Sequence, residues 1–269
     1  MMADDRLRVG WIGLGAMGLG MARCAARSGH RVVGHTRGRP QHGVLAHEGG
    51  ALSRDLQEVV AAADVVCVNV FSGEQAVGVL YDEAVLASLR PGAILVLHTT
   101  SDPALALRLA ADAPRGVEVV DAAFSGSPDE AATGALTMMV GGDPGAFERV
   151  RPLLASYAGF LRHVGPLGAG MQLKLINNLL FAAQVRLADD AYRIAGSQGL
   201  DMVTMAEIIA RGSGASRALA IVGAGGSAAR NLERMRPYLD KDVAAAIGAA
   251  RAADIDLGLL GKVARGDEQ

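Results

Sequence analysis

The stretch LRVGWIGLGAMGLGMARCAARSGHRVVGHTR, residues 7–37, contains an apolar run, a glycine-rich turn, an alanine-rich segment and a second apolar run. The run Leu7–Ile12 is nearly unbroken, which is typical of a strand in a parallel sheet that is covered on both faces. Gly13–Gly18 follows it directly. A helix is predicted from this turn to about Ser28, before a second strand at Arg31–His35. The order strand, turn, helix, strand predicts a βαβ unit.

The glycine-rich turn has the G-x-G-x-x-G spacing of a dinucleotide-binding loop. In such a loop the first glycine permits a tight turn, the second lets backbone approach a pyrophosphate, and the third allows close packing of helix on strand. Amide groups at the start of the helix then bind the phosphates. The residues that we predict to bind a dinucleotide here are Gly13, Leu14, Gly15, Ala16, Met17 and Gly18.

The end of the second strand bears on which dinucleotide is bound. An NAD-binding domain usually has an acidic residue about 20 residues after the loop, where it holds the ribose hydroxyls. Here Thr36, Arg37, Gly38 and Arg39 follow the strand, without Asp or Glu. A guanidinium binds a 2′-phosphate through two hydrogen bonds, whereas a carboxylate would repel it. Thr36 and Arg37 therefore favour NADP, with NAD as the alternative cofactor and a solvated basic turn as the alternative explanation.

Further apolar runs alternate with alanine-rich helical stretches up to about residue 164. The remaining strands are predicted at Val65–Val70, Ile94–His98, Val117–Ala122, Thr137–Val140 and Leu161–Val164. Strands that alternate with helices are typical of a doubly wound α/β domain with a mostly parallel sheet. We predict a Rossmann domain over residues 1–164.

Beyond residue 164 the sequence favours helices without a convincing strand. One long helix is predicted over Met171–Gly199, and a last helix over about Asp240–Ala253, after Pro237. We therefore predict an all-α domain over residues 165–269, joined to the Rossmann domain through the long helix.

Composition and charge exclude several classes of function. The hydrophobic fraction of 51% is enough to bury a core. A formal charge of −2 without a lysine-rich run is no footprint for nucleic acid or an anionic membrane surface, and no apolar run reaches the roughly 18 residues that span a bilayer. Cys24 and Cys67 make neither a disulfide framework nor a metal cluster. We expect a cytoplasmic protein with a small-molecule substrate and no metal site.

Three segments occur in a fixed order along the chain. The first is Gly13–Gly18, with a methionine before its last glycine. The second runs over Asp121–Ser127 and continues through Gly134–Gly142, and the third is Gly168–Asn178. Together they resemble the β-hydroxyacid dehydrogenase family, over nearly the whole chain. The resemblance implies reversible oxidation of a small β-hydroxy acid to its semialdehyde or keto acid, with a nicotinamide dinucleotide as the redox cofactor.

The third segment contains the residues that the resemblance assigns to catalysis. Lys174 and Asn178 are four residues apart, so they share one face of the predicted long helix. The resemblance implies that Lys174 is the general acid/base for the substrate oxygen and that Asn178 orients this oxygen. Flanking apolar side chains would partly desolvate Lys174, which lowers the pKa of a lysine toward the range useful for catalysis. The alternative is a surface lysine whose stem packs on an apolar helix.

The second segment is the predicted substrate site. Phe124, Ser125, Gly126 and Ser127 follow the predicted strand Val117–Ala122, and amides and hydroxyls at this edge of a sheet suit a substrate carboxylate. An ordinary polar turn is the alternative. The family pattern is D-A-P-V-S-G-G, and three positions depart from it. The replacements are Ala123 for proline, Phe124 for valine and Ser127 for the second glycine. No individual substrate is therefore implied.

The resemblance places four more residues beside the cofactor. Val70 and Phe71 stand where the family has an L-P pair, and Thr100 corresponds to the threonine of an S-T pair. Lys241, followed by Asp242, resembles a K-D-L segment and is expected in the first turn of the last helix. Strand-end packing and a solvated surface lysine are the alternatives for these positions.

Two other functions and one assembly are considered. Imine reductases resemble this fold but usually lack a lysine at the position of Lys174, while Phe124 favours some unusual substrate. A non-catalytic dinucleotide-binding protein would have lost Lys174 or Asn178, and both are present. A homodimer is expected because the apolar helix Met171–Ala183 needs cover that a small helical domain does not provide.

Overall fold

The computed structural model describes residues 6–224 and 228–266 of the chain. By compactness the chain divides into two units, Met1–Lys174 and Leu175–Gln269. This division lies on the carboxyl side of the domain boundary expected at residue 164.

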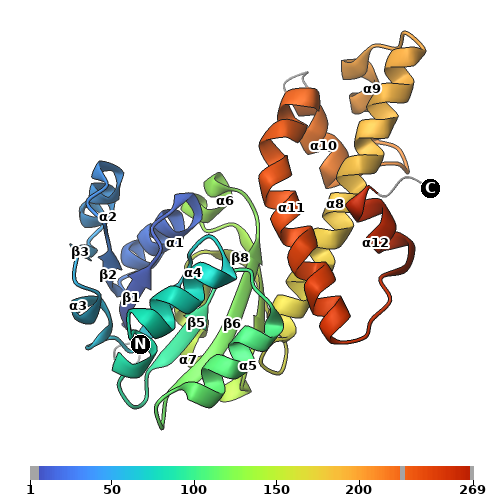
Figure 1. The fold of residues 1–269 in the computed structure, drawn as a ribbon. Coiled ribbons are helices and arrows are strands. Elements are labelled where there is room, and N and C mark those ends of the chain that lie inside the picture. The colour runs from blue at the N-terminus through green and yellow to red at the C-terminus, as the bar shows by residue number, and fades with distance from the viewer. Residues whose placement is uncertain (1–5, 225–227, 267–269) are drawn as a thin grey trace. The chain divides into compact units, whose positions relative to one another are not determined.

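The first unit contains an eight-stranded sheet with the order β3-β2-β1-β4-β5-β6-β7-β8 (Figure 1). Its strands are β1 (Arg8–Ile12), β2 (Arg31–His35), β3 (Ala51–Ser53), β4 (Val65–Val68), β5 (Ile94–Leu97), β6 (Glu118–Ser125), β7 (Leu136–Gly141) and β8 (Ala158–Gly165). Neighbouring strands are parallel except for β6 and β7, which are antiparallel. The predicted doubly wound, mostly parallel sheet is confirmed.

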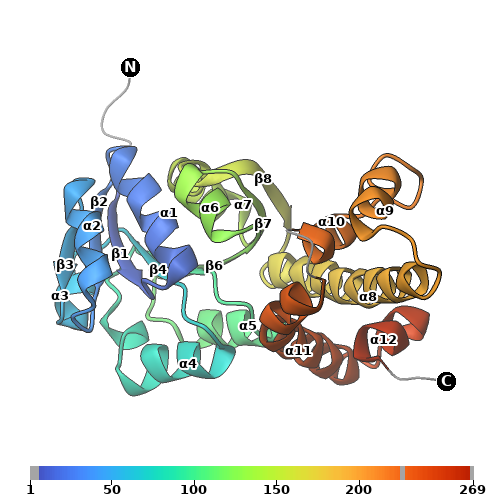
Figure 2. The same ribbon diagram turned by 90° about the horizontal axis from the view of Figure 1, so that it is seen from above.

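Helices cover both faces of this sheet (Figure 2). One face packs against α1 (Ala16–Arg27), α6 (Pro128–Thr133) and α7 (Pro144–Ala155), and the other against α3 (Leu56–Val60), α4 (Gly73–Val77) and α5 (Pro103–Asp112). Shorter helical segments are α2 (Val44–His47), two 3-10 turns at Pro40–Gly43 and Leu86–Ser88, and a π-helical turn at Gly78–Asp82. Successive strand residues alternate between the two cores, so Trp11 is buried on one face and Ile12 on the other.

A buried aromatic cluster fixes the centre of the sheet. The rings of Trp11 and His98 stack with centroids 5.8 Å apart, and Tyr157 meets Trp11 edge-on. Burial lowers the pKa of His98 to about 4, so its imidazole is neutral near pH 7. Nδ1 of His98 then donates to the carbonyl of Ala122 over 2.7 Å, and Nε2 accepts from the Tyr157 hydroxyl over 3.2 Å. The first bond holds the end of β5 against β6, and the second joins it to Tyr157 between α7 and β8.

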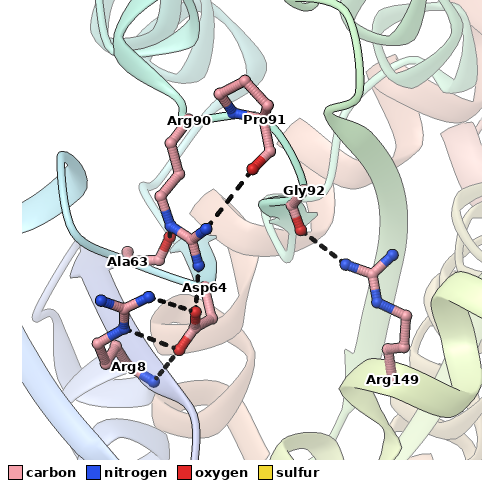
Figure 3. A network of polar contacts seen from close by, with 7 residues as sticks. All are labelled: Arg8, Ala63, Asp64, Arg90, Pro91, Gly92 and Arg149. Atoms are coloured by element: carbon pink, nitrogen blue, oxygen red, sulfur yellow. Dashed lines mark hydrogen bonds and ion pairs between the residues drawn. The ribbon is translucent and has the colours of Figure 1, made fainter.

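A charged network joins the amino ends of the central strands (Figure 3). Asp64, just before β4, accepts hydrogen bonds from the backbone and the guanidinium of Arg8, both over 2.8 Å, and it also pairs with Arg90. Arg149 of α7 donates to the carbonyl of Gly92 over 2.6 Å. The Arg8 hydrogen bonds lower the pKa of Asp64 to about 2, so this carboxylate is ionised throughout the neutral range.

The second unit is built from helices in its described residues. Helix α8 (Ala169–Ser197) begins in the first unit and continues into the second, and α9 (Met202–Ile209), α10 (Arg217–Gly223), α11 (Ala228–Ala252) and α12 (Gly258–Arg265) follow. The predicted helical second half is confirmed. Within residues 6–224 and 228–266, no helix combines the length and the apolar character needed to cross a membrane.

Helix α11 corrects the prediction for the last part of the chain. It begins at Ala228 and runs through Pro237, so Lys241 lies well inside a helix and not in its first turn. Proline removes a backbone donor from a helix interior and disfavours this position. Packing outweighs that cost here, because Leu232 before the proline and Leu239 after it join the same apolar cluster.

Candidate active site

The glycine-rich loop Gly13–Gly18 connects the carboxyl end of β1 to α1. Gly13 has a φ of +99° and lies against the carbonyl of Asn69, so a side chain would be both strained and obstructed there. At Gly15 the place of a Cβ has nothing within 4 Å. No described side chain caps α1, and its first turn has no acidic residue. The loop therefore offers an uncapped helix N-terminus and open space above Gly15, which fits the pyrophosphate of a dinucleotide.

A cleft of about 530 Å³ lies beside this loop, at the carboxyl ends of β1, β2 and β4. This volume is within the usual range of ligand pockets. The predicted cofactor residues that line the cleft are Gly13, Leu14, Gly15, Arg37, Val70 and Phe71. The first-unit residues Ala16, Met17, Gly18, Thr36 and Thr100 were also predicted to bind the cofactor and are not part of its lining.

The turn after β2 is held together by Thr36. Its buried hydroxyl lies 2.7 Å from Nδ1 of His42 and accepts from the amide of Gly38 over 3.1 Å. Burial is the main cause that lowers the pKa of His42, so Nδ1 can accept a hydrogen bond from the Thr36 hydroxyl. Arg37 is 79% exposed and 3.9 Å from Glu83. Thr36 thus shapes the turn, while the Arg37 guanidinium is accessible to a ligand.

Sequence reasoning missed Arg54 beside this turn. Arg54 follows β3, and a Cβ placed on Gly38 would lie 2.7 Å from its Nη2 atom. The edge strand β3 pairs in parallel with β2, with Ser53 opposite His35. Residues that follow the two strands are therefore neighbours. The three-residue strand was not predicted, and its pairing was the only signal that could have identified Arg54.

The loop after β4 begins earlier than expected. The strand ends at Val68 and not at Val70, because the amide of Val70 donates to the Thr99 hydroxyl over 3.0 Å and leaves the ladder. Asn69 and Phe71 line the cleft beside Val70. Of the threonine pair, Thr99 makes this contact, whereas Thr100 is half-buried outside the cleft lining. Asn69 and Thr99 were not predicted as site residues.

The substrate segment also differs from the expected turn. Strand β6 continues to Ser125, so Phe124 and Ser125 lie in a strand, where they pair with Met138 and Thr137 of β7. Ser127 is the N-cap of α6. Its hydroxyl accepts from the Glu130 amide over 3.2 Å, and its own amide donates to the Glu130 carboxylate over 2.7 Å. The antiparallel partner strand, which sequence spacing does not reveal, extends β6.

Lys174 lies on α8 and is half-buried. The start of this helix is bound to the sheet through Asp121 of β6, whose carboxylate accepts from the amides of Gly168 and Met171, each over 2.6 Å. Asp121 belongs to the second of the three sequence segments, without a predicted role of its own. The structure joins it to the third.

In the second unit, Asn178 and Lys241 belong to one polar cluster. Nδ2 of Asn178 donates to Asp242 over 2.6 Å, and Oδ1 of Asn178 accepts from Asn177 over 3.0 Å. Asp242 also lies 3.4 Å from the Lys241 ammonium. Asp242 connects two residues that were predicted independently. The sequence signal for it was only its place next to Lys241.

Two family models together match most of the chain. Residues 8–165 match the NAD binding domain of 6-phosphogluconate dehydrogenase, and residues 168–266 match the NAD-binding domain of NADP-dependent 3-hydroxyisobutyrate dehydrogenase. An NAD-dependent L-serine dehydrogenase of Pseudomonas aeruginosa is 32% identical over 257 residues, covering 91% of this chain and 86% of the relative.

Solved structures also match nearly the whole chain. The 3-hydroxyisobutyrate dehydrogenase of Mycobacterium tuberculosis, solved with L-serine, has a TM-score of 0.82 at 29% identity and covers 97% of this chain and 92% of its own. An imine reductase of Streptomyces aurantiacus has a TM-score of 0.68 at 19% identity, over 96% of this chain and 92% of that one. The second likeness is one of fold alone.

Proposed function

This chain belongs to the β-hydroxyacid dehydrogenase family, and from that premise we propose that Lys174 is the general acid/base of its reaction. The family relation makes the protein an NAD(P)-dependent oxidoreductase that acts on the CH–OH group of a small hydroxy acid. The half-buried position of Lys174 on α8, in the segment that carries the family resemblance, is the observation that supports its role.

The proposed proton transfer balances a hydride transfer. When bound, the nicotinamide ring supplies the hydride acceptor for oxidation and the hydride donor for reduction. During oxidation the neutral amine of Lys174 takes the proton from the substrate hydroxyl while the C–H bond loses its hydride. During reduction the ammonium returns a proton to the carbonyl oxygen. General acid–base catalysis of this kind contributes roughly 10²–10⁴-fold to a rate.

Asn178 is proposed to orient the substrate oxygen. An amide nitrogen has two hydrogens, and one of those on Asn178 is used by Asp242. The other is the donor that we assign to the substrate. Its partner Asp242 fixes the amide orientation. The ammonium of Lys241 lies beside the other oxygen of that carboxylate. Lys241 is proposed to attract the negatively charged cofactor.

Ser125 and Gly126 are proposed to bind the substrate carboxylate, with Phe124 limiting the size of the substrate. The half-buried Phe124 ring contacts the His98 ring edge-on at 6.2 Å, which keeps it in place. Both polar groups of Ser127 serve the cap of α6. Its contribution to the substrate site is therefore proposed to be the shape of the turn.

NADP is proposed as the preferred cofactor. The exposed side chains of Arg37, Arg39 and Arg54 lie on or beside one turn at the cleft, and they can surround a 2′-phosphate. The contact between Arg37 and Glu83 is long and exposed, so it contributes little that a phosphate would have to displace. The supporting observation is this group of guanidinium ions where an NAD enzyme has a carboxylate.

A homodimer is proposed on the basis of an exposed apolar stripe along α8. Leu173, Leu180, Leu187 and Ile194 recur every seven residues and are each 40–58% exposed. In paired helices apolar residues occupy two positions of each seven-residue repeat, and this stripe supplies one of the two. The proposed occupant is the same stripe of a second copy. Light scattering should give a dimer mass, and Leu187→Glu a monomer, whereas Leu107→Glu on α5 should leave the mass unchanged. A wild-type monomer contradicts the assembly.

The function is tested with substrate and cofactor panels. The purified protein should oxidise L-serine or 3-hydroxyisobutyrate, or reduce the corresponding semialdehydes, with a lower KM for the NADP form than for the NAD form. Reduction of cyclic imines in preference to every semialdehyde would favour the imine reductase alternative. Activity of Lys174→Ala at the wild-type rate would remove the acid/base assignment and leave the family relation intact.

A further inference from the structure

We propose that Asp121 is a positioning residue, which fixes the first turn of α8, and with it Lys174, relative to the strand that carries the substrate segment. The proposal rests on the acid/base role proposed for Lys174. It concerns residues of the first unit only, and it assigns a task to a carboxylate that does not itself reach the reacting atoms.

The two hydrogen bonds that the Asp121 carboxylate accepts both come from the beginning of α8. Its side chain is 0% exposed. Oδ1 accepts from the amide of Gly168, and Oδ2 accepts from the amide of Met171, each over 2.6 Å. The first amides of a helix have no partner within the helix, and they carry its positive dipole end. The two oxygens of one carboxylate therefore hold Gly168, directly before α8, and Met171, in its first turn.

The surroundings are shaped to this carboxylate. A Cβ on Gly170 would lie 2.8 Å from Oδ2 of Asp121, and a Cβ on Gly141 would overlap Oδ1. Gly141 belongs to β7 and Gly170 to α8. Two elements thus use glycine where any other residue would displace the carboxylate or the helix. Such close approach places the first turn of α8 directly on the sheet.

Asp121 links the two predicted parts of the site along the chain. Toward the carboxyl end of β6, Phe124 and Ser125 follow on the same strand. On α8, Lys174 follows Met171 by three residues, which is about one turn of the same helix. A strand and a helix are both stiff over such distances. The bonds of Asp121 therefore set the separation between the substrate segment and the Lys174 side chain.

The cost of this arrangement argues that it serves more than stability. Burial raises the pKa of Asp121 to about 6, against the opposing effect of the amide donors, and no charged side chain contributes to the shift. A buried anion without a counter-ion destabilises a fold. Holding the helix start is the benefit visible in the structure.

The test compares Asp121→Asn with a matched control. Asp143 caps α7, where it accepts from the amides of Gly145 and Ala146 over 2.7 and 3.1 Å, and α7 carries no predicted site residue. Asparagine at either position keeps the size of the side chain and removes the charge. In Asp121→Asn one of the two amides of α8 meets an NH₂ group and loses its acceptor.

Asp121→Asn is expected to lower kcat by about a hundredfold, because a displacement of 1 Å can have such an effect. The KM for the cofactor should stay within about twofold, and the solvent deuterium isotope effect on kcat should increase as proton transfer becomes slow. Asp143→Asn should leave kcat and the isotope effect unchanged. If Asp121→Asn does not fold, Asp121→Ser is used, since it keeps one acceptor and leaves room for water.

Wild-type kcat and isotope effect in a folded Asp121 variant would overturn the proposal. So would equal losses in the Asp121 and Asp143 variants, because loss of a carboxylate charge at a helix start would then explain both. Lys174→Ala separates this proposal from the proposed function. If that variant is inactive while Asp121→Asn is normal, only the positioning role fails. If Lys174→Ala is fully active, the acid/base assignment fails first.

Discussion

The amino and carboxyl ends of the strands in the first unit use a carboxylate in opposite ways. Asp64, at the amino end, is paired with Arg8 and Arg90, and its pKa is lowered to about 2. Asp121, opposite the last residue of β5, accepts hydrogen bonds from backbone amides, and burial raises its pKa to about 6. The first carboxylate is stabilised as an anion. The second is ionised near pH 7 at a cost to folding, which its proposed positioning role would offset.

The same contrast holds for the cationic side chains. At the amino end, guanidinium groups such as those of Arg8 and Arg149 are used in ion pairs and carbonyl contacts. At the carboxyl end, Arg37 is mostly exposed at a cleft, and α1 begins without a described side-chain cap. At the amino end of the sheet these cationic groups are already paired, while at the carboxyl end an exposed cation can bind an anion.

The largest expected effect concerns the chemistry assigned to the carboxyl side of the sheet. Lys174→Ala should lower kcat by about a thousandfold, within the range for a lost general acid/base, and leave cofactor binding intact. Steady-state kinetics and a cofactor fluorescence titration would measure the two effects. Lys262→Ala on α12 is the control lysine and should behave like wild type. Comparable losses in both variants would contradict the assignment.

The next prediction concerns whether the ionised carboxylate of Asp121 stabilises or destabilises the fold. Because the pKa of Asp121 is higher in the folded chain than in the unfolded chain, its contribution to stability is fully present below pH 3.8. This contribution is lost as the pH rises through about 6. Relative to Asp121→Asn, the wild type should therefore lose about 2–3 kcal/mol between pH 4 and pH 7. Urea unfolding at several pH values would measure the difference. A difference that grows with pH would mean that the ionised carboxylate is stabilising.

A smaller effect is expected for the arginines at the cleft. The double variant Arg37→Ala, Arg54→Ala should raise the KM for NADPH by roughly 10- to 100-fold, because charge-assisted bonds to a phosphate are lost. The KM for NADH should hardly change. Arg115→Ala, an exposed arginine before β6, is the control. An equal rise for NADH and NADPH would mean that these arginines do not recognise the 2′-phosphate.

The smallest effect is expected at the amino end. Asp64→Asn should lower the free energy of unfolding by about 1 kcal/mol at pH 7, since the pair is partly exposed, and should leave kcat unchanged. Because the pKa is lowered, the contribution of Asp64 is present above pH 3.8 and is lost as the pH falls through about 2. The two proteins should thus converge in acid. A change in kcat would mean that Asp64, at the amino end of the sheet, also affects catalysis, contrary to this prediction.

Local patterns predicted the doubly wound sheet and the glycine loop well. Short apolar runs and the strand–turn–helix order depend on neighbouring residues, and both are visible in one sequence. The errors arose where distant parts of the chain decide the outcome. Strand β6 continues to Ser125 because β7 pairs with it, and α11 passes through Pro237 because its two sides pack into one cluster.

The candidate site shows the same limit. Lys174, Asn178 and Lys241 were predicted from their resemblance to a family pattern. Arg54 is defined by what it touches across the fold, and the only local signal for Asp242 was its place next to Lys241. Asp121 was quoted in a motif, but its bonds to the start of α8 depend on the third dimension.

The open space above Gly15 has a practical consequence. Gly15 has a φ of −73°, which any residue can adopt, and a Cβ there would meet no atom within 4 Å. A larger side chain at this position should fold without strain and would occupy the space predicted for a pyrophosphate. A site that binds its ligand through backbone amides cannot be removed by truncating a side chain. It can be blocked by a side chain that fills its space. Substitution of Gly15 alone should therefore give a stably folded protein with weakened cofactor binding.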